Sequence, residues 1–242
     1  YNQAIEITAL GALAKLPKSV TTGVLAKDKD GDQMYALLST LLFAQWNAVP
    51  AATTWNTFDP TTQWLDALNT GLGEIDQPGD YDLDQRYSSS ADYYSIAQLI
   101  ANSGLGYLYE DPQGRISYAD STHRTEYFST YGYVDLSAND ALGAGFTTVT
   151  RSGDIRNKVT INYKHNQSSS FTDSDAESIA VYGELGQVVD TTLENAADAE
   201  SQAAFYLGLR AYPQAVFDSI TYQLASPELS DSDRDALIKV FM

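Results

Sequence analysis

Apolar and polar residues alternate along several stretches of the chain, which is the period-two pattern of half-buried β-strands. The clearest stretch begins at Asn157, where Val159, Ile161 and Tyr163 fall on one side and the residues between them on the other. Weaker alternation predicts further strands at 4–10, 105–109, 115–119 and 146–151. The strands near 105 and 115 flank Asp111-Pro-Gln-Gly114, whose residue types favour a type I turn, so we expect a hairpin there.

Helical spacing, with apolar residues three or four apart, appears in three other places. The first helix is expected from Met34 to Trp46, after a polar turn at 28–32 in which Asp32 serves as the cap. The second is expected from Ala91 to Asn102, with Ser89 and Asp92 as a capping pair. The predicted buried faces are Leu37, Leu38, Leu41 and Leu42 in the first helix and Tyr93, Ile96, Ala97 and Ile100 in the second, which Gly104 ends.

The third helix lies in the stretch from Asn157 to Leu224, on which the architecture depends. After the first strand come a polar loop (His165 to Ala176), the run Ser178 to Gly183, and a second extended run near Gln187 to Leu193. The helix then starts at Asn195 and is stopped by Pro213. Its expected buried face is Ala196, Ala199, Ala203, Tyr206 and Leu207, and the closing strand carries Val216, Ile220, Tyr222 and Leu224 on one face. Of the remaining segments, 49–60 is expected to be irregular and 127–145 to be loop-like, and 66–92 is acidic and punctuated by glycines.

Charge narrows the classes of partner. The chain of 242 residues has a formal net charge of −18, and no Lys or Arg lies between Lys164 and Arg210. Such a surface repels phosphate, so tight nucleic-acid binding is disfavoured.

The sequence contains no Cys, which excludes disulfide scaffolds and thiolate chemistry. Tyr1 opens directly into strand-like sequence and the chain ends within an apolar run, so we expect it to be a fragment of a longer protein.

Candidate catalytic groups are sparse. His123 and His165 are the only imidazoles, and neither accompanies a Gly-x-Ser-x-Gly elbow or a His-Glu-x-x-His motif. The acidic runs Asp80-Tyr-Asp82-Leu-Asp84 and Asp28-Lys-Asp30-Gly-Asp32 begin like calcium loops but lack the closing acid. With 32 acidic residues, a pair spaced for glycoside hydrolysis has little meaning by itself. We therefore expect no catalytic, cofactor-binding or metal-binding residues and no enzymatic activity.

The order of these motifs resembles a known family. It runs from Asn157-Lys-Val-Thr-Ile-Asn-Tyr163 through Asp175 to Gly183 and Thr191-Thr-Leu193 to the Ala-rich helix. Upstream stand an apolar helix ending in Trp46, an acidic glycine-containing segment, a helix containing Leu99, and the motifs Gly106-Tyr-Leu-Tyr-Glu-Asp111 and Gly114-Arg-Ile116. From about Asp32 to Leu224, the chain resembles the tail-tip hub, or minor tail protein, of long-tailed (siphovirus-like) bacteriophages, which is similar in turn to the baseplate hubs of contractile tails.

This resemblance implies an α+β fold with antiparallel, tail-tube-like β-barrel elements and an inserted helical segment with a β-hairpin. The expected domains are 1–30 (first part of the barrel), 31–125 (inserted helix and hairpin) and 126–242 (second barrel-like α+β domain). It also implies a structural virion protein, made in the bacterial cytoplasm, that forms a homotrimeric hub ring around the DNA exit channel. Its implied partners are copies of itself, the distal tail or tail-tube protein, the tape-measure protein and other minor tail proteins, with only transient, non-specific passage of DNA.

Two other interpretations stay open. A cell-wall glycan-binding or glycan-cleaving module of a tail protein would use the many aromatic residues, since 17 Tyr, 3 Trp and 8 Phe can stack on sugars. An acidic adaptor protein unrelated to phage is the other interpretation, and it would explain only the negative charge of the chain. A hub should be a trimer on the tail axis, whereas a glycan module should be a monomer that binds cell-wall polysaccharide.

Overall fold

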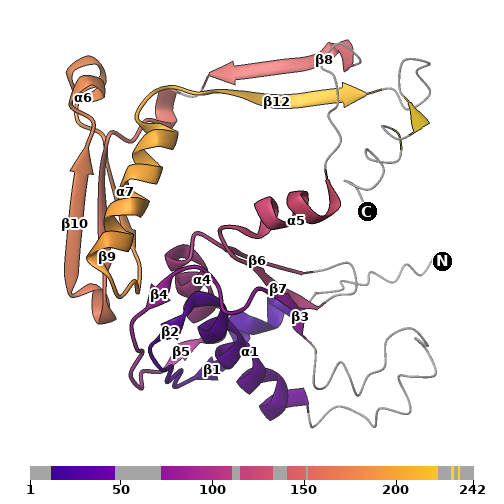
Figure 1. The fold of residues 1–242 in the computed structure, drawn as a ribbon, viewed down its shortest axis with the longest axis vertical. Helices are drawn as coiled ribbons and strands as arrows, with labels where there is room; N and C mark the ends of the chain where they lie inside the picture. Colours follow the sequence, from indigo (N-terminus) through magenta and orange to yellow (C-terminus); the bar gives the residue numbers. More distant parts are fainter. Residues whose placement is uncertain are drawn as a thin grey trace, which may run out of the picture. The chain divides into compact units, whose positions relative to one another are not determined.

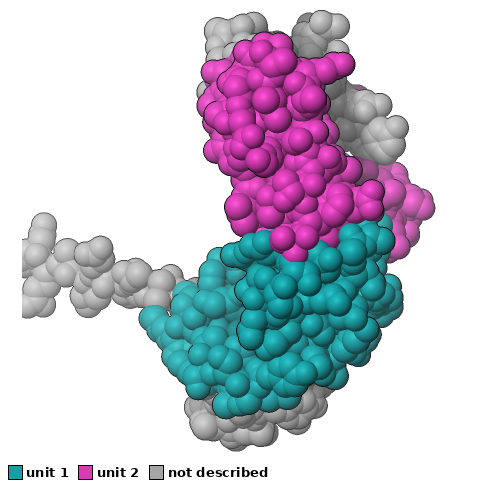
Figure 2. All heavy atoms as spheres, turned by 90° about the vertical axis from the view of Figure 1, so that its left-hand side faces the viewer, with its two compact units in different colours: residues 1–123, 162–169, 190–198 teal, residues 124–161, 170–189, 199–242 magenta. Residues whose placement is uncertain are grey.

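The computed structural model divides the chain into two compact units, which are coloured separately in Figure 2. Unit 1 comprises residues 1–123, 162–169 and 190–198, and unit 2 comprises 124–161, 170–189 and 199–242. The structure describes residues 12–46, 72–110, 115–132, 141–150, 152–222, 230, 231 and 234. The strand predicted at 4–10 and the irregular segment at 49–60 lie outside these ranges. The predicted domain limits at 30 and 125 stay a prediction.

Unit 1 packs two helices, α1 (Asp30–Trp46) and α4 (Tyr93–Ser103), against each other and against a three-stranded sheet (Figure 1). In that sheet β7 (Ile116–Ala119) is central, antiparallel to β6 (Tyr107–Glu110) and parallel to β3 (Leu72–Ile75). The predicted hairpin strands are therefore confirmed, although the turn between them is outside the described residues. The other elements are the 3-10 helix η1 (Ala12–Lys18) and the short strands β1 (Val20–Thr21), β2 (Asp28–Lys29), β4 (Asp82–Leu83) and β5 (Ala91–Asp92).

The predicted core faces of both unit 1 helices are confirmed where side chains are described. Met34, Leu37 and Leu38 are buried on α1. On α4 the buried residues include Tyr93, Ile96, Ala97 and Ile100, and Gly104 is the C-cap, as predicted. The capping predictions were partly wrong. Asp92 caps α4 by accepting from Ser95 N–H, but Ser89 instead donates its N–H to Thr22 O. Asp32 lies inside the first turn, because α1 begins at Asp30.

In unit 2 the chain forms α5 (His123–Tyr131, beginning one residue before the unit), β8 (Ala141–Thr150) and the 3-10 turn η3 (Ser152–Asp154). A three-stranded sheet follows in the order β10 (Ser169–Ser174), β9 (Lys158–Tyr163), β11 (Gly186–Asp190). The helices α6 (Ala176–Tyr182) and α7 (Ala196–Arg210) and the strand β12 (Ala215–Tyr222) complete it. The 3-10 turn η4 (His165–Gln167), between β9 and β10, belongs to unit 1. The apolar core includes Ile155, Val159, Ile161, Ala199, Ala203, Leu207 and Ala211.

Several expectations for this half of the chain were wrong. The sequence predicted a loop at 127–145, but residues 127–131 belong to helix α5 and 141–145 already belong to β8. Part of the predicted polar loop at 165–176 is strand β10, and 176–182 is helical. The predicted strand at 157–163 is confirmed, as are the buried positions Val159 and Ile161. The helix after Asn195 is also confirmed, but Ala196 is exposed.

The strands β8 and β12 form a separate antiparallel ribbon, and within the described residues each pairs only with the other (Figure 1). The registry shifts between Phe217 and Ser219 and between Ile220 and Tyr222. The protein is thus α+β, as expected. The described strands make up small sheets of two or three strands with no closed barrel among them, so the tail-tube-like barrel stays a prediction.

Candidate functional site

The centre of unit 1 is a fully buried carboxylate, Asp30, at the first residue of α1. Its Oδ2 accepts a hydrogen bond from the Tyr118 hydroxyl of β7 at 2.6 Å. Its Oδ1 accepts from the backbone N–H of Tyr81 at 2.8 Å, and Tyr81 O in turn accepts from Asp30 N–H. Negative charge at a helix N-terminus is favoured by the exposed N–H groups of the first turn. Asp30 therefore joins α1, the loop before β4 and β7 at one point.

Glycines make room for this carboxylate. A Cβ at Gly79, which has φ +89, would lie 2.5 Å from Asp30 Oδ1, and a Cβ at Gly104 would lie 2.6 Å from Asp30 Oδ2. A Cβ at Gly106 would meet the Tyr118 hydroxyl at 2.5 Å. The loop that contains Gly79 and the α4–β6 loop that contains Gly104 and Gly106 therefore approach the Asp30–Tyr118 pair so closely that a side chain at these positions would clash.

Burial raises the pKa of Asp30, and the hydrogen bonds from Tyr118 and Tyr81 oppose that rise. Burial also raises the pKa of Tyr118, and the neighbouring Asp30 charge raises it further. The phenol therefore stays protonated and acts as a donor throughout the ordinary pH range. Because its partners are all internal, the pair is suited to holding segments together rather than to proton transfer with a substrate.

A second polar cluster surrounds the start of α5, and it includes one of the two histidines. His123 Nδ1 lies 2.7 Å from Asp76 Oδ2, and the same oxygen accepts from Asp120 N–H at 3.0 Å. Asp120 Oδ1 accepts the N–H groups of Thr122 and His123, which caps the turn. Burial raises the pKa of Asp120, as do the nearby charges of Asp80 and Asp76.

A serine triad would need a hydroxyl directed at the imidazole that the acid orients. Asp76 is placed as an orienting acid for His123, but the nearby hydroxyls donate elsewhere. Ser121 Oγ donates to Asp80, and Thr122 Oγ1 lies within hydrogen-bond distance of both Asp80 and Asp120. The cluster is thus arranged as a capped turn, not as a nucleophile with its base.

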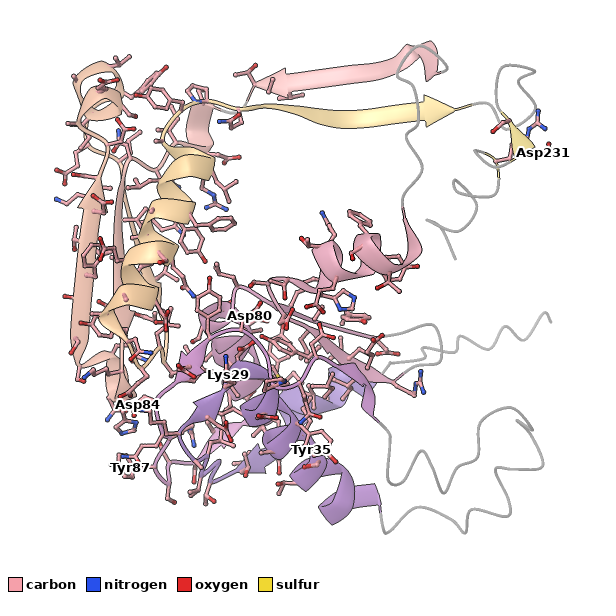
Figure 3. The ribbon with its side chains drawn as sticks, viewed as in Figure 1. Lys29, Tyr35, Asp80, Asp84, Tyr87 and Asp231 are labelled. Carbon is pink, nitrogen blue, oxygen red and sulfur yellow. The ribbon has the colours of Figure 1, made fainter. Side chains whose placement is uncertain are left out.

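The second histidine, His165, lies in a strained turn. Lys164, Asn166 and Gln167 have φ values of +68, +54 and +52, which side-chain-bearing residues rarely adopt. Its N–H donates to Asp84 Oδ2 at 2.7 Å, and its ring meets Tyr87 edge to face at 4.7 Å between centroids. Asp84 and Tyr87, labelled in Figure 3, come from the segment after β4. These contacts fix the turn that connects β9 to β10.

The two acidic runs that begin like calcium loops do not converge. Asp30 is buried against Tyr118, whereas Asp28 belongs to β2 and Asp32 accepts from Gln77. Asp80 faces the start of α5, while Asp84 accepts from the His165 and Gln85 N–H groups. Within the described ranges, no group of three or more His, Asp or Glu side chains is arranged to hold a metal ion.

Unit 2 has its own buried polar centre, Asn157, directly before β9. Its side chain donates to Gly183 O at 2.7 Å and accepts from Leu185 N–H at 2.7 Å. Its backbone carbonyl accepts from Asp175 N–H, the N-cap residue of α6. Ser178, also buried, donates to Ala211 O beyond α7. Asn157 therefore fixes both ends of α6 against the sheet, a role that its place in an alternating strand did not reveal.

Large apolar side chains are exposed on both units. On unit 1 they include Val20, Val24, Tyr87 and Tyr107, and on unit 2 Val181, Val188, Phe205 and Leu209. Of the three tryptophans in the sequence, Trp46, Trp55 and Trp64, the last two fall outside the described residues. None of the helices in the described ranges is long and apolar enough to cross a bilayer.

Comparison with known proteins gives one informative description. No family model and no curated protein matches the chain. Among solved structures, it is similar to the prophage tail protein gp18 from Listeria monocytogenes EGD-e, with 16% sequence identity and a TM-score of 0.34. The similarity covers 60% of this chain and 44% of that chain, so this chain spans less than half the length of the Listeria protein. A likeness at that TM-score carries no conclusion about this chain's fold, which is drawn from the described elements alone.

Proposed function

We propose that this chain is a structural protein of a bacteriophage tail and that it forms the hub ring of the tail tip. One observation carries the proposal, namely the order of the elements. An apolar helix (α1), an acidic glycine-containing segment, a second helix (α4), a hairpin (β6–β7), a strand (β9) and an Ala-rich helix (α7) succeed one another. That is the order of the motifs on which the resemblance to tail-tip hubs depends.

The ribbon of β8 and β12 supports a role in assembly. A two-stranded ribbon is marginally stable by itself, and both of its outer edges carry unpaired backbone N–H and C=O groups. Within the described residues, β8 and β12 have no third strand beside them. Strands of neighbouring copies, or of the rest of a longer polypeptide, would complete the ladder. In a homotrimeric ring these added strands would form the tail-tube-like barrel.

The charge of −18 supports the proposed position around a DNA channel. An acidic wall repels the phosphate backbone and lets DNA pass without adhering. In this proposal the ring joins the tail tube or distal tail protein to the distal tip and contacts the tape-measure protein and other minor tail proteins. It catalyses no reaction.

The test is the state of the purified protein and its position in the particle. Sedimentation velocity should give a trimer, negative-stain images should show a ring, and gold-labelled antibody should mark the tail axis at the tip. A protein that stays monomeric at about 100 µM, where a trimer of micromolar affinity would be assembled, and that is absent from virions would refute the proposal.

A glycan-binding module is the second candidate, and exposed aromatic rings favour it. Tyr107 is half exposed on β6, 5.5 Å from Tyr109 between ring centroids, a geometry on which a sugar ring could stack. Binding to purified cell-wall polysaccharide that Tyr107→Ala abolishes, by a protein that stays monomeric, would favour this candidate over the hub.

A further inference from the structure

The helix α7 distributes its side chains in an unusual way. The face turned into unit 2 carries two alanines, Ala199 and Ala203, together with Gln202 and Leu207. The opposite face carries Phe205 and Leu209, which are each 50% exposed. A surface helix normally places its largest apolar residues towards the core and its polar residues outside. The outer face of α7 is therefore too apolar to be explained by the packing of unit 2.

The exposed apolar surface continues beyond the end of the helix. Tyr212 follows Phe205 and Leu209 at the same helical spacing and is 41% exposed. Its ring lies edge to face with that of Tyr182, 6.5 Å away between centroids, and Val181 beside it is 70% exposed. We call this set, Phe205, Leu209, Tyr212, Tyr182 and Val181, the α7 patch. Aromatic side chains of this kind are typical anchors of protein interfaces.

Gly208 is an independent indication of a partner. It lies between Phe205 and Leu209, near the end of a 15-residue helix, where glycine is less stable than alanine. A Cβ built at Gly208 would meet nothing within 4 Å, so no neighbour inside the protein requires glycine there. Ala204, one turn earlier, is also small and exposed. Two small residues one turn apart allow the backbone of another helix to approach closely.

The charges around the α7 patch indicate the chemistry of that helix. Asp175 and Glu177 stand at the start of α6, and Glu200 lies one turn before Ala204 on the exposed side of α7. Lys158 is paired with Glu184 at 2.9 Å, and Arg210 donates to Gln187. A second copy bound through the same face would bring these acids against each other. A partner with basic residues flanking its apolar face would be complementary.

We propose that the α7 patch docks an amphipathic helix of another protein, one whose apolar stripe is flanked by Lys and Arg. Phe205 and Leu209 supply the apolar contact, and Gly208 allows the two helix backbones to approach closely. The acidic residues around the patch, Asp175, Glu177 and Glu200, favour a basic partner. This assignment goes beyond the proposed hub function and does not depend on it.

The test uses the whole chain and two synthetic probes. Both are 18-residue peptides with the same Leu and Ala stripe, flanked by Lys in one and by Glu in the other. Isothermal titration should show the Lys peptide binding at least tenfold more tightly than the Glu peptide, with an affinity that falls as salt rises from 50 to 300 mM. Equal binding of both peptides, or none of the Lys peptide at 1 mM, overturns the proposal.

Substitutions locate the contact. Gly208→Leu should leave the thermal midpoint unchanged or higher, because its surroundings are open, yet weaken the Lys peptide at least tenfold. Phe205→Ser should also weaken binding of the Lys peptide at least tenfold, with little change in the stability of the protein. The matched controls are Gly153→Leu, at another open glycine, and Val188→Ser, at another exposed apolar residue; both should bind like the wild type. Binding that survives Gly208→Leu and Phe205→Ser would refute this location.

Sedimentation equilibrium of the same variants shows whether a second copy of this chain, and not a basic helix of another protein, occupies the α7 patch. If the wild-type chain self-associates and Gly208→Leu dissociates it, a second copy occupies the α7 patch and the basic-partner assignment is wrong. If the chain is trimeric and the variant stays trimeric, hub assembly and α7 docking use different surfaces. A monomeric chain that binds the Lys peptide would refute the hub proposal and leave this one standing.

Discussion

Removing the Tyr118 hydroxyl should destabilise the protein more than any other loss of a single oxygen atom from a described tyrosine. Tyr118→Phe keeps the buried ring but leaves Asp30 Oδ2 without the donor that lies 2.6 Å away. Asp30 is fully buried, so water cannot replace that donor without opening the core. Losing one hydrogen bond to a buried charged group lowers the free energy of unfolding by about 3 kcal/mol, which corresponds to about a hundredfold in the folded-to-unfolded ratio.

The size of this loss should depend on pH, with a definite sign. Burial raises the folded-state pKa of Asp30 above its ordinary value of 3.8, and the Tyr118 hydrogen bond limits that rise. For a raised pKa, the stabilising protonated form is fully effective below the unfolded pKa and is lost as pH rises through the folded pKa. Tyr118→Phe raises the folded pKa further, so its penalty grows with pH. We expect Tyr118→Phe to lower the free energy of unfolding by about 1 kcal/mol where Asp30 is protonated and by about 3 kcal/mol where it is ionised.

The assay is urea unfolding followed by circular dichroism at intervals from pH 5 to pH 8. This range lies above the sequence pI of about 4.2, because the protein is expected to precipitate near its pI. Asp30→Asn removes the titrating group, so its stability relative to the wild type should rise steadily with pH. Tyr212→Phe is the control, since that exposed hydroxyl also donates to a carboxylate, Asp175, and should leave the midpoint unchanged. A Tyr118→Phe penalty below about 1 kcal/mol at pH 8, or one that does not change with pH, would refute the reasoning.

Three further predictions concern other buried or crowded groups. Asn157→Ala should lower the free energy of unfolding by about 3 kcal/mol in urea titrations, because Gly183 O and Leu185 N–H both lose a buried partner; a loss under about 1 kcal/mol would show that water replaces the side chain. Gly79→Ala should cost more than about 2 kcal/mol, because of φ +89 and the contact with Asp30 Oδ1, whereas Gly153→Ala, in open space, should be neutral. Asp80→Asn should lower the pKa of Asp120 in a carboxyl ¹³C titration, since the Asp80 charge is one cause of the raised value; an unchanged pKa would show that the Asp80 charge is not among its causes.

The helices of unit 1 could be predicted from the sequence because several independent signals agree there. In α4 the three-four spacing, the cap residue Asp92 and the terminating Gly104 all indicate the same segment, and the structure confirms each. In β9, alternation alone was sufficient, because Val159 and Ile161 are buried between polar neighbours. Local pattern and tertiary packing favour the same conformation at these positions.

Strand β10 and helix α6 could not be predicted, for identifiable reasons, whereas the extended run predicted near 187–193 is confirmed by β11. Strand β10 is mostly polar because, among the described strands, it lies at the edge of its sheet and pairs only with β9. Phe171 is the one apolar residue in its run of Ser, Thr and Asp. Helix α6 contains Ile179 and Val181, two β-branched residues that favour strands. It is helical because Asp175 caps it and Asn157 holds both of its ends. Long-range contacts override local propensity here.

The Asp30–Tyr118 pair was missed because its partners are 88 residues apart and Asp30 lies in a run that reads as a polar turn. The available signal was three glycines, Gly79, Gly104 and Gly106, near acidic or aromatic residues. Each is required by close approach to Asp30 or Tyr118, residues that are far from one another in the sequence. Burial of an isolated Asp is rare, so no pattern of charges could indicate it.

The two units share one structural feature, a buried polar side chain at the centre of each, and this feature is relevant to function. Each is organised by a buried polar side chain, Asp30 or Asn157, that is hydrogen-bonded to several segments at once, and the buried face of α7 in unit 2 includes two alanines, Ala199 and Ala203. Meanwhile Phe205 and Leu209, which would each contribute about 1.5–3 kcal/mol if buried, remain half exposed on α7. A protein that acts alone gains nothing from this distribution, because larger core residues and a polar outer face would make it more stable and more soluble. The same distribution benefits a subunit whose stable state is an assembly, where the exposed apolar residues are covered by partners. We therefore infer that selection has acted on surfaces of this chain that other subunits contact, which is what both proposals require.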